Sequence, residues 1–240
     1  MKEVIKKYLP NFFWFFLRDT KNRLKNFYPY HALRYFSLIN IDYKINTKLL
    51  FGAKESKFFN NKLSKSKFYL EFGSGNSTLL AEIKNKNFLS VESDKNFFDY
   101  MIKKVNKKKF YFVDFGIVGF YSYPYFLKFS QKKAFDYSSN PFLVLKKNNL
   151  PDLILVDGRY RVLVGLFTYK YFLNNTKNFT IIFDDYFEPR TSKINRDHYS
   201  ILSEFFYIRK IGRFGVASKI KQKSKKFLKT KINKYLLDPR

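Results

Sequence analysis

The stretch YLEFGSGNSTLL, residues 69–80, places two glycines directly after a short apolar run. Gly73 and Gly75 allow the backbone to turn sharply and to approach a ligand with no side chain in between. Asn76 or Ser77 can cap the helix that follows, whose free N–H groups then point at the ligand. The stretch therefore predicts a strand, a binding loop and a helix. The alternative is a tight strand-to-helix turn that binds nothing.

Short apolar runs alternate with amphipathic stretches from Lys67 onward, which is typical of a parallel α/β sheet. The last two runs flank a tight turn near Gly212 and form an antiparallel hairpin. We predict a Rossmann-like α/β fold with a mostly parallel, seven-stranded sheet. Its strands are expected at residues 67–72, 87–92, 110–114, 151–157 and 178–185 and in the hairpin 206–221, with helices at 76–85, 94–105, 162–175 and 198–206.

A single domain with additions at both ends fits the length of 240 residues. The α/β domain is predicted to span residues 67–220, after a helical or irregular N-terminal extension, residues 1–66. Residues 221–240 form a basic tail or a last helix. The segment 116–149 has no assignment and is expected to be functional or to contain a helix. In the last helix the inward-facing residues are predicted to be Leu228, Ile232, Tyr235 and Leu236.

The formal net charge of +28 favours polyanions as partners, because Lys and Arg neutralise phosphates. Lys outnumbers Arg, however, and Phe, Tyr, Asn and Ile are abundant while Ala and Gly are scarce, as an A/T-rich genome produces. Most of the charge is therefore expected on solvated surface. A nucleic acid partner is left open but is not favoured.

The absence of Cys excludes disulfides, thiolate zinc sites and a Cys nucleophile, and it favours a cytoplasmic location. The apolar run LPNFFWFFL, residues 9–17, is shorter than the ~20 residues that cross a bilayer. It lacks the small-residue cleavage site of a signal peptide, and basic residues flank it. We predict either a helix packed on the domain or a peripheral contact with a membrane surface.

Two acids lie close to the glycine loop or at the next strand end. Glu92 ends the second predicted strand, 19 positions after Gly73, where a carboxylate can accept both hydroxyls of a ribose. Glu71 precedes the loop and suits a positively charged ligand rather than a pyrophosphate. Thr78 stands where a dinucleotide-binding loop has a third Gly or Ala, which weakens a nicotinamide interpretation without excluding it. S-adenosylmethionine has both a ribose and a cationic amino acid part.

The motifs LEFGSGNST, VESD, LVDGRYRV and FDDY, in this order, resemble the class I S-adenosylmethionine-dependent methyltransferases. The loop of that family is an acid, any residue and Gly-x-Gly-x-Gly, and Ser77 replaces the third glycine here. A closer similarity, over residues 67–219, is to bacterial proteins of unassigned substrate with the motifs GSGxST, VESD, VDGRxRV and DDY. The resemblance implies that S-adenosylmethionine is the cofactor, with Asp114 near its adenosine end. The predicted cofactor-binding residues are Glu71, Gly73, Ser74, Gly75, Asn76, Ser77, Glu92 and Asp114.

Further acids are expected at the carboxyl edge of the sheet, because Asp157 ends the fourth predicted strand and Asp184 and Asp185 end the fifth. They repel one another unless a cation or a proton intervenes, and Mg²⁺ suits such ligands. The pattern resembles the metal-dependent O-methyltransferases of catechols and macrolide sugars. That resemblance implies a Mg²⁺ on Asp157, Asp184 and Asp185 that orients a substrate hydroxyl and lowers its pKa. Alternatively, Asp185 only caps a loop.

His198 follows the fifth predicted strand and is the candidate general base, with Asp157 as a second catalytic candidate. The alternative is a structural histidine. Arg159 and Arg161 are predicted to contact an anionic substrate or the cofactor carboxylate, since Arg binds carboxylates and phosphates in a bidentate manner. Either arginine can equally pair with Asp184.

These features predict an S-adenosylmethionine-dependent methyltransferase that acts on a hydroxyl of a small molecule or glycan, with or without Mg²⁺. The alternatives are a non-catalytic or degenerate cofactor-binding module, an RNA-binding methyltransferase and a nicotinamide-binding protein. The motif DDYFEPR, residues 184–190, differs from the DPPY-like motif of enzymes that methylate nucleic acid bases, which argues against base methylation. The sequence does not predict the acceptor or the oligomeric state.

Overall fold

The computed structural model describes residues 28–39, 41, 43–126, 130–145, 150–173, 178–187 and 197–239, with the backbone alone at residues 120, 197 and 198. Within them a seven-stranded sheet has the order β3-β2-β1-β4-β5-β7-β6. The first five strands run parallel, and β7 pairs antiparallel with both β5 and β6. The predicted Rossmann-like sheet with a C-terminal hairpin is thereby confirmed. The strands are β1 (Tyr69–Phe72), β2 (Phe88–Glu92), β3 (Phe110–Phe112), β4 (Leu153–Val156), β5 (Thr180–Phe183), β6 (Phe206–Ile211) and β7 (Phe214–Ile220).

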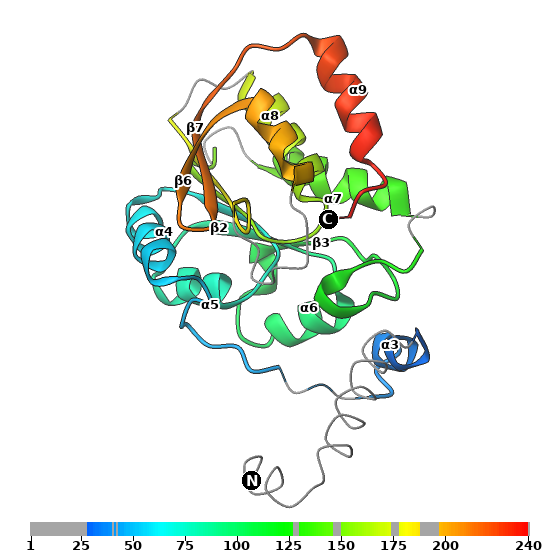
Figure 1. Cartoon of the computed structure of the whole chain (residues 1–240). Helices are drawn as coiled ribbons and strands as arrows, with labels where there is room; N and C mark the ends of the chain where they lie inside the picture. Colours follow the sequence, from blue (N-terminus) through cyan, green and yellow to red (C-terminus); the bar gives the residue numbers. More distant parts are fainter. Residues whose placement is uncertain are drawn as a thin grey trace, which may run out of the picture.

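Helices cover both faces of the sheet (Figure 1). One layer holds α4, α5 and α6, and the other holds α7, α8 and α9, while α3 lies beside α6. The helices are α3 (Tyr28–Tyr35), α4 (Ala53–Lys65), α5 (Asn76–Ile83), α6 (Lys95–Met101), α7 (Gln131–Val144), α8 (Arg161–Leu173) and α9 (Lys225–Tyr235), with the 3₁₀ helices η1 (Lys107–Lys109), η2 (Phe120–Ser122) and η4 (Asp197–Glu204).

The sheet has a hydrophobic core on each face, and successive residues of a central strand pack alternately into one core and the other. In β1, Tyr69 packs in the core under α4 and α5, whereas Leu70 packs in the core under α8. All four residues of β4 are buried, so its run LILV shows no polar alternation, as expected for a parallel strand covered on both faces. Each fully buried Leu, Ile or Val side chain contributes about 1.5–3 kcal/mol relative to exposure. This rigid sheet fixes the positions of the residues that follow each strand.

The segment 116–149, for which the sequence predicted no definite structure, contains α7. Its buried side chains include Ala134, Tyr137, Ser138 and Phe142, which recur at helical spacing. Ser138 and Pro141 fall in the same buried stripe, and these residues are unusual inside an apolar helical face, so the pattern is obscured in the sequence. The predicted helix at 198–206 is the 3₁₀ helix η4 instead.

Helices outside the predicted domain boundaries also pack on the sheet. Phe59 and Leu63 of α4 belong to one core. Leu228 and Tyr235 of α9 are buried in the other, with Ile232 and Leu236 half-buried against it, as predicted. The domain boundaries after residues 66 and 220 stay predictions.

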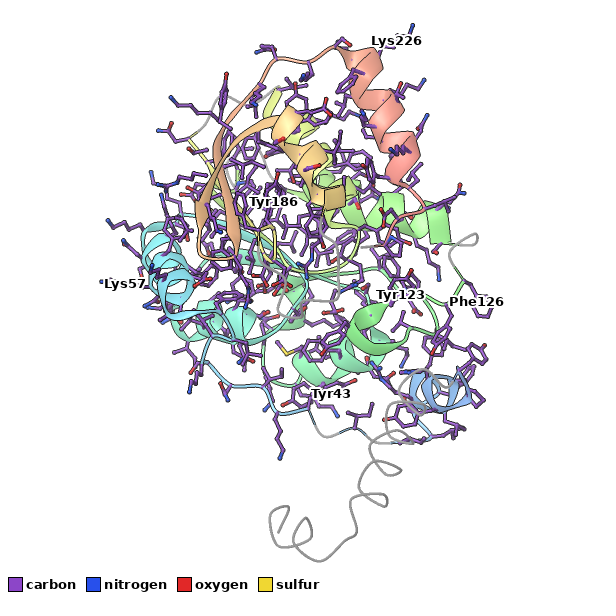
Figure 2. All side chains as sticks on the ribbon, in the orientation of Figure 1. Tyr43, Lys57, Tyr123, Phe126, Tyr186 and Lys226 are labelled. Atoms are coloured by element: carbon purple, nitrogen blue, oxygen red, sulfur yellow. The ribbon has the colours of Figure 1, made fainter. Side chains whose placement is uncertain are left out.

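Basic side chains are spread over the surface rather than gathered on one element (Figure 2). Lys57 of α4 and Lys226 of α9, at distant points of the molecule, both project into solvent. None of the helices in the described ranges has the length and apolar character needed to span a membrane. Residues 9–17 lie outside the described residues, so their predicted packing or membrane contact stays a prediction, as does the cytoplasmic location.

Candidate functional site

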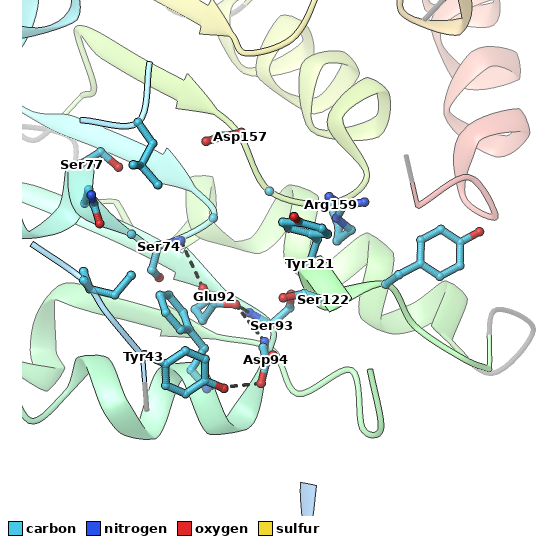
Figure 3. A pocket seen from close by; sticks show the side chains of 18 of the residues that line it. Tyr43, Ser74, Ser77, Glu92, Ser93, Asp94, Tyr121, Ser122, Asp157 and Arg159 are labelled. Atoms are coloured by element: carbon cyan, nitrogen blue, oxygen red, sulfur yellow. Dashed lines mark hydrogen bonds between the residues drawn. The ribbon is translucent and has the colours of Figure 1, made fainter. Parts of the chain in front are cut away.

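A cavity of about 780 Å³ lies at the carboxyl ends of β1, β2 and β4 (Figure 3). Ligands of open α/β sheets bind at this edge, and the volume lies in the range of small-molecule and cofactor sites. Most of the predicted site residues are brought together here. Those that line the cavity are Gly73, Ser74, Gly75, Asn76, Ser77, Glu92, Asp157, Arg159, Arg161 and Asp185.

The two glycines of the loop after β1 serve different purposes. Gly73 has a φ of +95°, and a Cβ on it would lie 2.7 Å from the Cα of Gly158 in the loop after β4. The two loops can therefore touch only because both residues are glycine. A Cβ on Gly75 would meet nothing within 4 Å. Gly73 is thus required by the fold, whereas Gly75 leaves open space at the cavity wall.

Gly73→Ala is expected to lower the free energy of unfolding by about 1–3 kcal/mol, because alanine at positive φ is strained and its methyl group overlaps the Gly158 backbone. Gly75→Ala serves as the matched control and is expected to change this free energy by less than about 0.5 kcal/mol. Urea unfolding of the two variants measures both values. Equal losses in the two variants would contradict this account of the loop.

Glu71 does not line the cavity, although the sequence predicted that it binds the cofactor. Its carboxylate is fully buried and accepts hydrogen bonds from the hydroxyls of Tyr69 at 2.7 Å, Ser77 at 2.7 Å and Thr78 at 2.5 Å. Burial raises the pKa of Glu71, and the hydroxyl donors counter that rise. Glu71 therefore ties β1 to the start of α5 and holds the loop, which is a positioning role rather than a ligand contact.

Glu92 ends β2 and lines the cavity, where the sequence predicted it. Its Oε2 accepts from the N–H of Ser74 at 3.2 Å, and its Oε1 accepts from the N–H groups of Ser93 at 2.6 Å and Asp94 at 2.9 Å. Only 3% of the residue is exposed, and this burial raises its pKa to about 7. The side chain joins the glycine loop to the end of β2 and presents a fixed acceptor to the cavity.

If Glu92 accepts the ribose hydroxyls of the cofactor, as the sequence predicts, binding of S-adenosylhomocysteine, the demethylated cofactor, should strengthen as the pH rises from about 6 to about 8. The pKa of Glu92 is raised to about 7, so below that pH the side chain is increasingly protonated and loses acceptor capacity for ribose hydroxyls. Calorimetric titrations at several pH values should give a dissociation constant that falls about tenfold per pH unit below 7 and then levels off. A dissociation constant that does not change over this range would contradict a contact between Glu92 and the ribose.

The acids at the ends of β4 and β5 are held by two arginines. Arg213, in the turn of the hairpin, binds Asp184 in a bidentate manner through Nε at 2.6 Å and Nη2 at 3.0 Å. Arg161 Nη2 donates to Asp157 Oδ1 at 3.0 Å, and its Nη1 lies 3.6 Å from Asp185 Oδ2. Burial alone would raise the pKa of Asp184, but the Arg213 fork lowers it. Burial and the nearby Asp184 together raise the pKa of Asp157.

The predicted Mg²⁺ site does not fit this arrangement. Asp184 is only 1% exposed and does not line the cavity, and its two carboxylate oxygens point at Arg213. Within the described ranges no group of three His, Asp or Glu side chains has the arrangement of a metal site. The positive charge beside these acids comes from the guanidinium groups of Arg161 and Arg213.

The two predicted substrate-binding arginines differ in their surroundings. Arg161 is buried and also donates to the backbone carbonyls of Gly158 at 3.1 Å, Asp184 at 2.7 Å and Asp157 at 3.1 Å. It therefore fixes the loops after β4 and β5. Arg159 lines the cavity, and its Nε is buried without a hydrogen-bond partner.

Two other predicted residues, Asp114 and Asn76, make contacts within the protein that the sequence did not predict. Asp114 accepts from the Tyr35 hydroxyl at 2.8 Å and from the N–H of Gly116 at 2.7 Å, and it does not line the cavity. Asn76 donates to the carbonyl of Lys48, so its side chain anchors the N-terminal segment. The side chain of His198 lies outside the described residues, and its role as a base stays a prediction.

The N-terminal segment forms a wall of the cavity that the sequence did not indicate. Ile41, Tyr43 and Ile45 line the cavity at alternate positions, and this period of two was the available signal. Arg34 of α3 is buried and forms an ion pair with Asp94, which caps α6. The described part of the N-terminal extension therefore contributes to the cavity wall.

No protein-family model matches the chain, and no curated protein sequence matches it. Among solved structures, it is similar to a methyltransferase-like protein from Silicibacter pomeroyi, with a TM-score of 0.66 and 24% identity over 82% of this chain and 100% of that one. An O-methyltransferase from Bacillus cereus in complex with S-adenosylhomocysteine matches with a TM-score of 0.40 and 14% identity, over 70% of this chain and 82% of that one. The likeness to the Silicibacter protein shows the fold.

Proposed function

We propose that this protein is an S-adenosylmethionine-dependent methyltransferase that methylates a hydroxyl of a small molecule or glycan. The observation that carries the proposal is the buried carboxylate of Glu92, fixed by the Ser74 N–H beside the glycine loop and facing a cavity of about 780 Å³. A carboxylate at the end of β2 is placed to accept the two hydroxyls of a ribose. The fold shared with a methyltransferase-like protein supports the same conclusion.

The residues around Glu92 fit the remaining parts of the cofactor. Tyr43 and Phe97 line the cavity with ring centroids 5.1 Å apart and offer an apolar surface for an adenine base. The N-terminus of α5, at Asn76 and Ser77, provides N–H groups for a carboxylate. The loop after β1, at Gly75, leaves room for the backbone of an amino acid.

When bound, the cofactor supplies an electrophilic methyl group on a sulfonium. Transfer forms a bond between this carbon and the acceptor oxygen, breaks the carbon–sulfur bond and releases the proton of the hydroxyl. The protein contributes mainly by aligning the oxygen with the methyl group. Asp157, which lines the cavity and whose pKa is raised by burial, is the proposed proton acceptor, and His198 remains the second candidate.

Transfer of labelled methyl groups from S-adenosylmethionine to a panel of phenols and sugars tests this function. We expect turnover on at least one acceptor, and a chelator should leave the rate unchanged, because arginines rather than a metal neutralise Asp157 and Asp184. Complete loss of turnover on chelation, restored by Mg²⁺, would contradict the assignment of these acids. Cofactor binding with no turnover on any acceptor would instead favour a non-catalytic binding module.

A further inference from the structure

Arg159 lines the cavity and forms no ion pair with the acids of the described residues. Its Nε is buried and has no hydrogen-bond partner among these residues. A guanidinium carries five N–H donors and cannot lose its charge at neutral pH. Burial of an unsatisfied donor costs about 1–3 kcal/mol, and more when the group is charged. Such a group is stabilised when an anion enters the cavity.

The other arginines at the cavity are already paired. Arg34 forms an ion pair with Asp94, and Arg161 pairs with Asp157 and Asp185. Arg213, which supports the edge of the cavity, binds Asp184. Asp94, Asp157, Asp184 and Asp185 are therefore paired with arginines other than Arg159. The positive charge of Arg159 remains for a ligand.

The position of Arg159 separates it from the residues expected to hold the cofactor, which are Glu92 for the ribose and the start of α5 for the carboxylate. It follows β4, whereas Glu92 ends β2, two strands away and thus about 10 Å across the sheet. In Figure 3, Arg159 lies beside Tyr121 and Ser122, on the far side of the cavity from Ser77. The cofactor carboxylate has donors of its own in the N–H groups at the start of α5. The end of the cavity at Arg159 is therefore left for the acceptor.

We propose that Arg159 binds a carboxylate or phosphate group of the acceptor, so that the natural substrate is an anionic molecule. The inference rests on the proposed function, since it presupposes a cofactor in the rest of the cavity. Tyr121 and Tyr123, which also line the cavity, offer ring faces to the body of such an acceptor. The net charge of +28 raises the local concentration of anions around the protein and speeds their arrival.

Calorimetry with three probes, benzoate, phenyl phosphate and neutral benzamide, tests the proposal on protein saturated with S-adenosylhomocysteine. We expect at least one anionic probe to bind about tenfold or more tightly than benzamide. Arg159→Met should abolish this preference. Arg209→Met, on the exposed face of β6, removes the same charge and should keep it. Equal affinities of the three probes for the wild-type protein, or an unchanged preference in Arg159→Met, would overturn the proposal.

A second comparison distinguishes the acceptor from the cofactor as the source of the anion. 5′-Methylthioadenosine lacks the carboxylate of S-adenosylhomocysteine. Arg159→Met should bind both compounds as the wild type does, whereas a loss for S-adenosylhomocysteine alone would assign Arg159 to the cofactor and overturn the proposal.

If Arg159→Met does not fold, Arg159→Lys keeps the charge and should show a weaker but retained preference for anions. Failure of the wild type to bind S-adenosylhomocysteine would instead contradict the proposed function.

Discussion

Glu92→Gln is expected to weaken binding of S-adenosylhomocysteine by about 10- to 100-fold. The carboxylate of Glu92 is fixed by three backbone N–H groups and is the acceptor for the ribose hydroxyls in the proposed complex. The amide has one acceptor oxygen fewer. Its NH₂ group faces either the ligand hydroxyls or the N–H groups of the protein, and it cannot accept a hydrogen bond from them. Calorimetric titration of the variant measures the loss.

Glu82→Gln is the matched control for this substitution. Glu82 lies on α5 and pairs with Lys109 outside the cavity, so its neutralisation should leave the affinity unchanged. The pH dependence of binding should also disappear in Glu92→Gln. An affinity equal to that of the wild type would show that the ribose is not held at Glu92.

Arg161→Met is expected to lower the free energy of unfolding by about 3–5 kcal/mol. The guanidinium is buried and joins the loops after β4 and β5 through Asp157, Asp185 and three carbonyl groups. Its removal leaves buried carboxylates without a counterion. The corresponding fall in melting temperature is about 6–20 °C for a chain of this size. Arg209→Met, in which an exposed arginine is removed, should change the free energy of unfolding far less.

The loss in free energy of unfolding caused by Arg161→Met should be smaller at acid pH than at neutral pH. The folded-state pKa of Asp157 is raised above its ordinary value of 3.8, so its protonation stabilises the folded state below that value, and this contribution is lost as the pH rises through the raised pKa. Without Arg161 that pKa rises further, and the variant is least impaired where Asp157 is neutral. Unfolding curves at acid and neutral pH measure the difference. A loss that is the same at all pH values would indicate lost packing rather than an unpaired charge.

The central strands and the glycine loop are predictable because their signals are local. The apolar runs at β1, β4 and β5 and the glycines after β1 each lie within a few consecutive residues. The places of Gly73 and Glu92 at the sheet edge can be predicted from their positions at the ends of β1 and β2 alone. α7 is not predictable in this way, because Ser138 and Pro141 occupy its buried face.

The roles of the acids depend on partners that their spacing in the sequence does not identify. Asp184 is neutralised by Arg213, which the hairpin brings back to β5. Glu71 faces Tyr69, Ser77 and Thr78 because β1 and α5 pack together, and not the ligand that its place before the loop suggested. Arg34 reaches Asp94 across 60 positions. Spacing identifies the sheet edge at which acids gather, but three-dimensional packing decides which of them meet a cation from the protein itself.

Titration of the wild-type protein with S-adenosylhomocysteine by isothermal calorimetry, at about pH 8 and without added metal, tests the central claim most directly. The account predicts binding of one molecule per chain, and the affinity should fall at least tenfold in Glu92→Gln. NAD should give no comparable heat. Absence of binding, or binding of NAD in preference to S-adenosylhomocysteine, would contradict the assignment of the cavity to this cofactor.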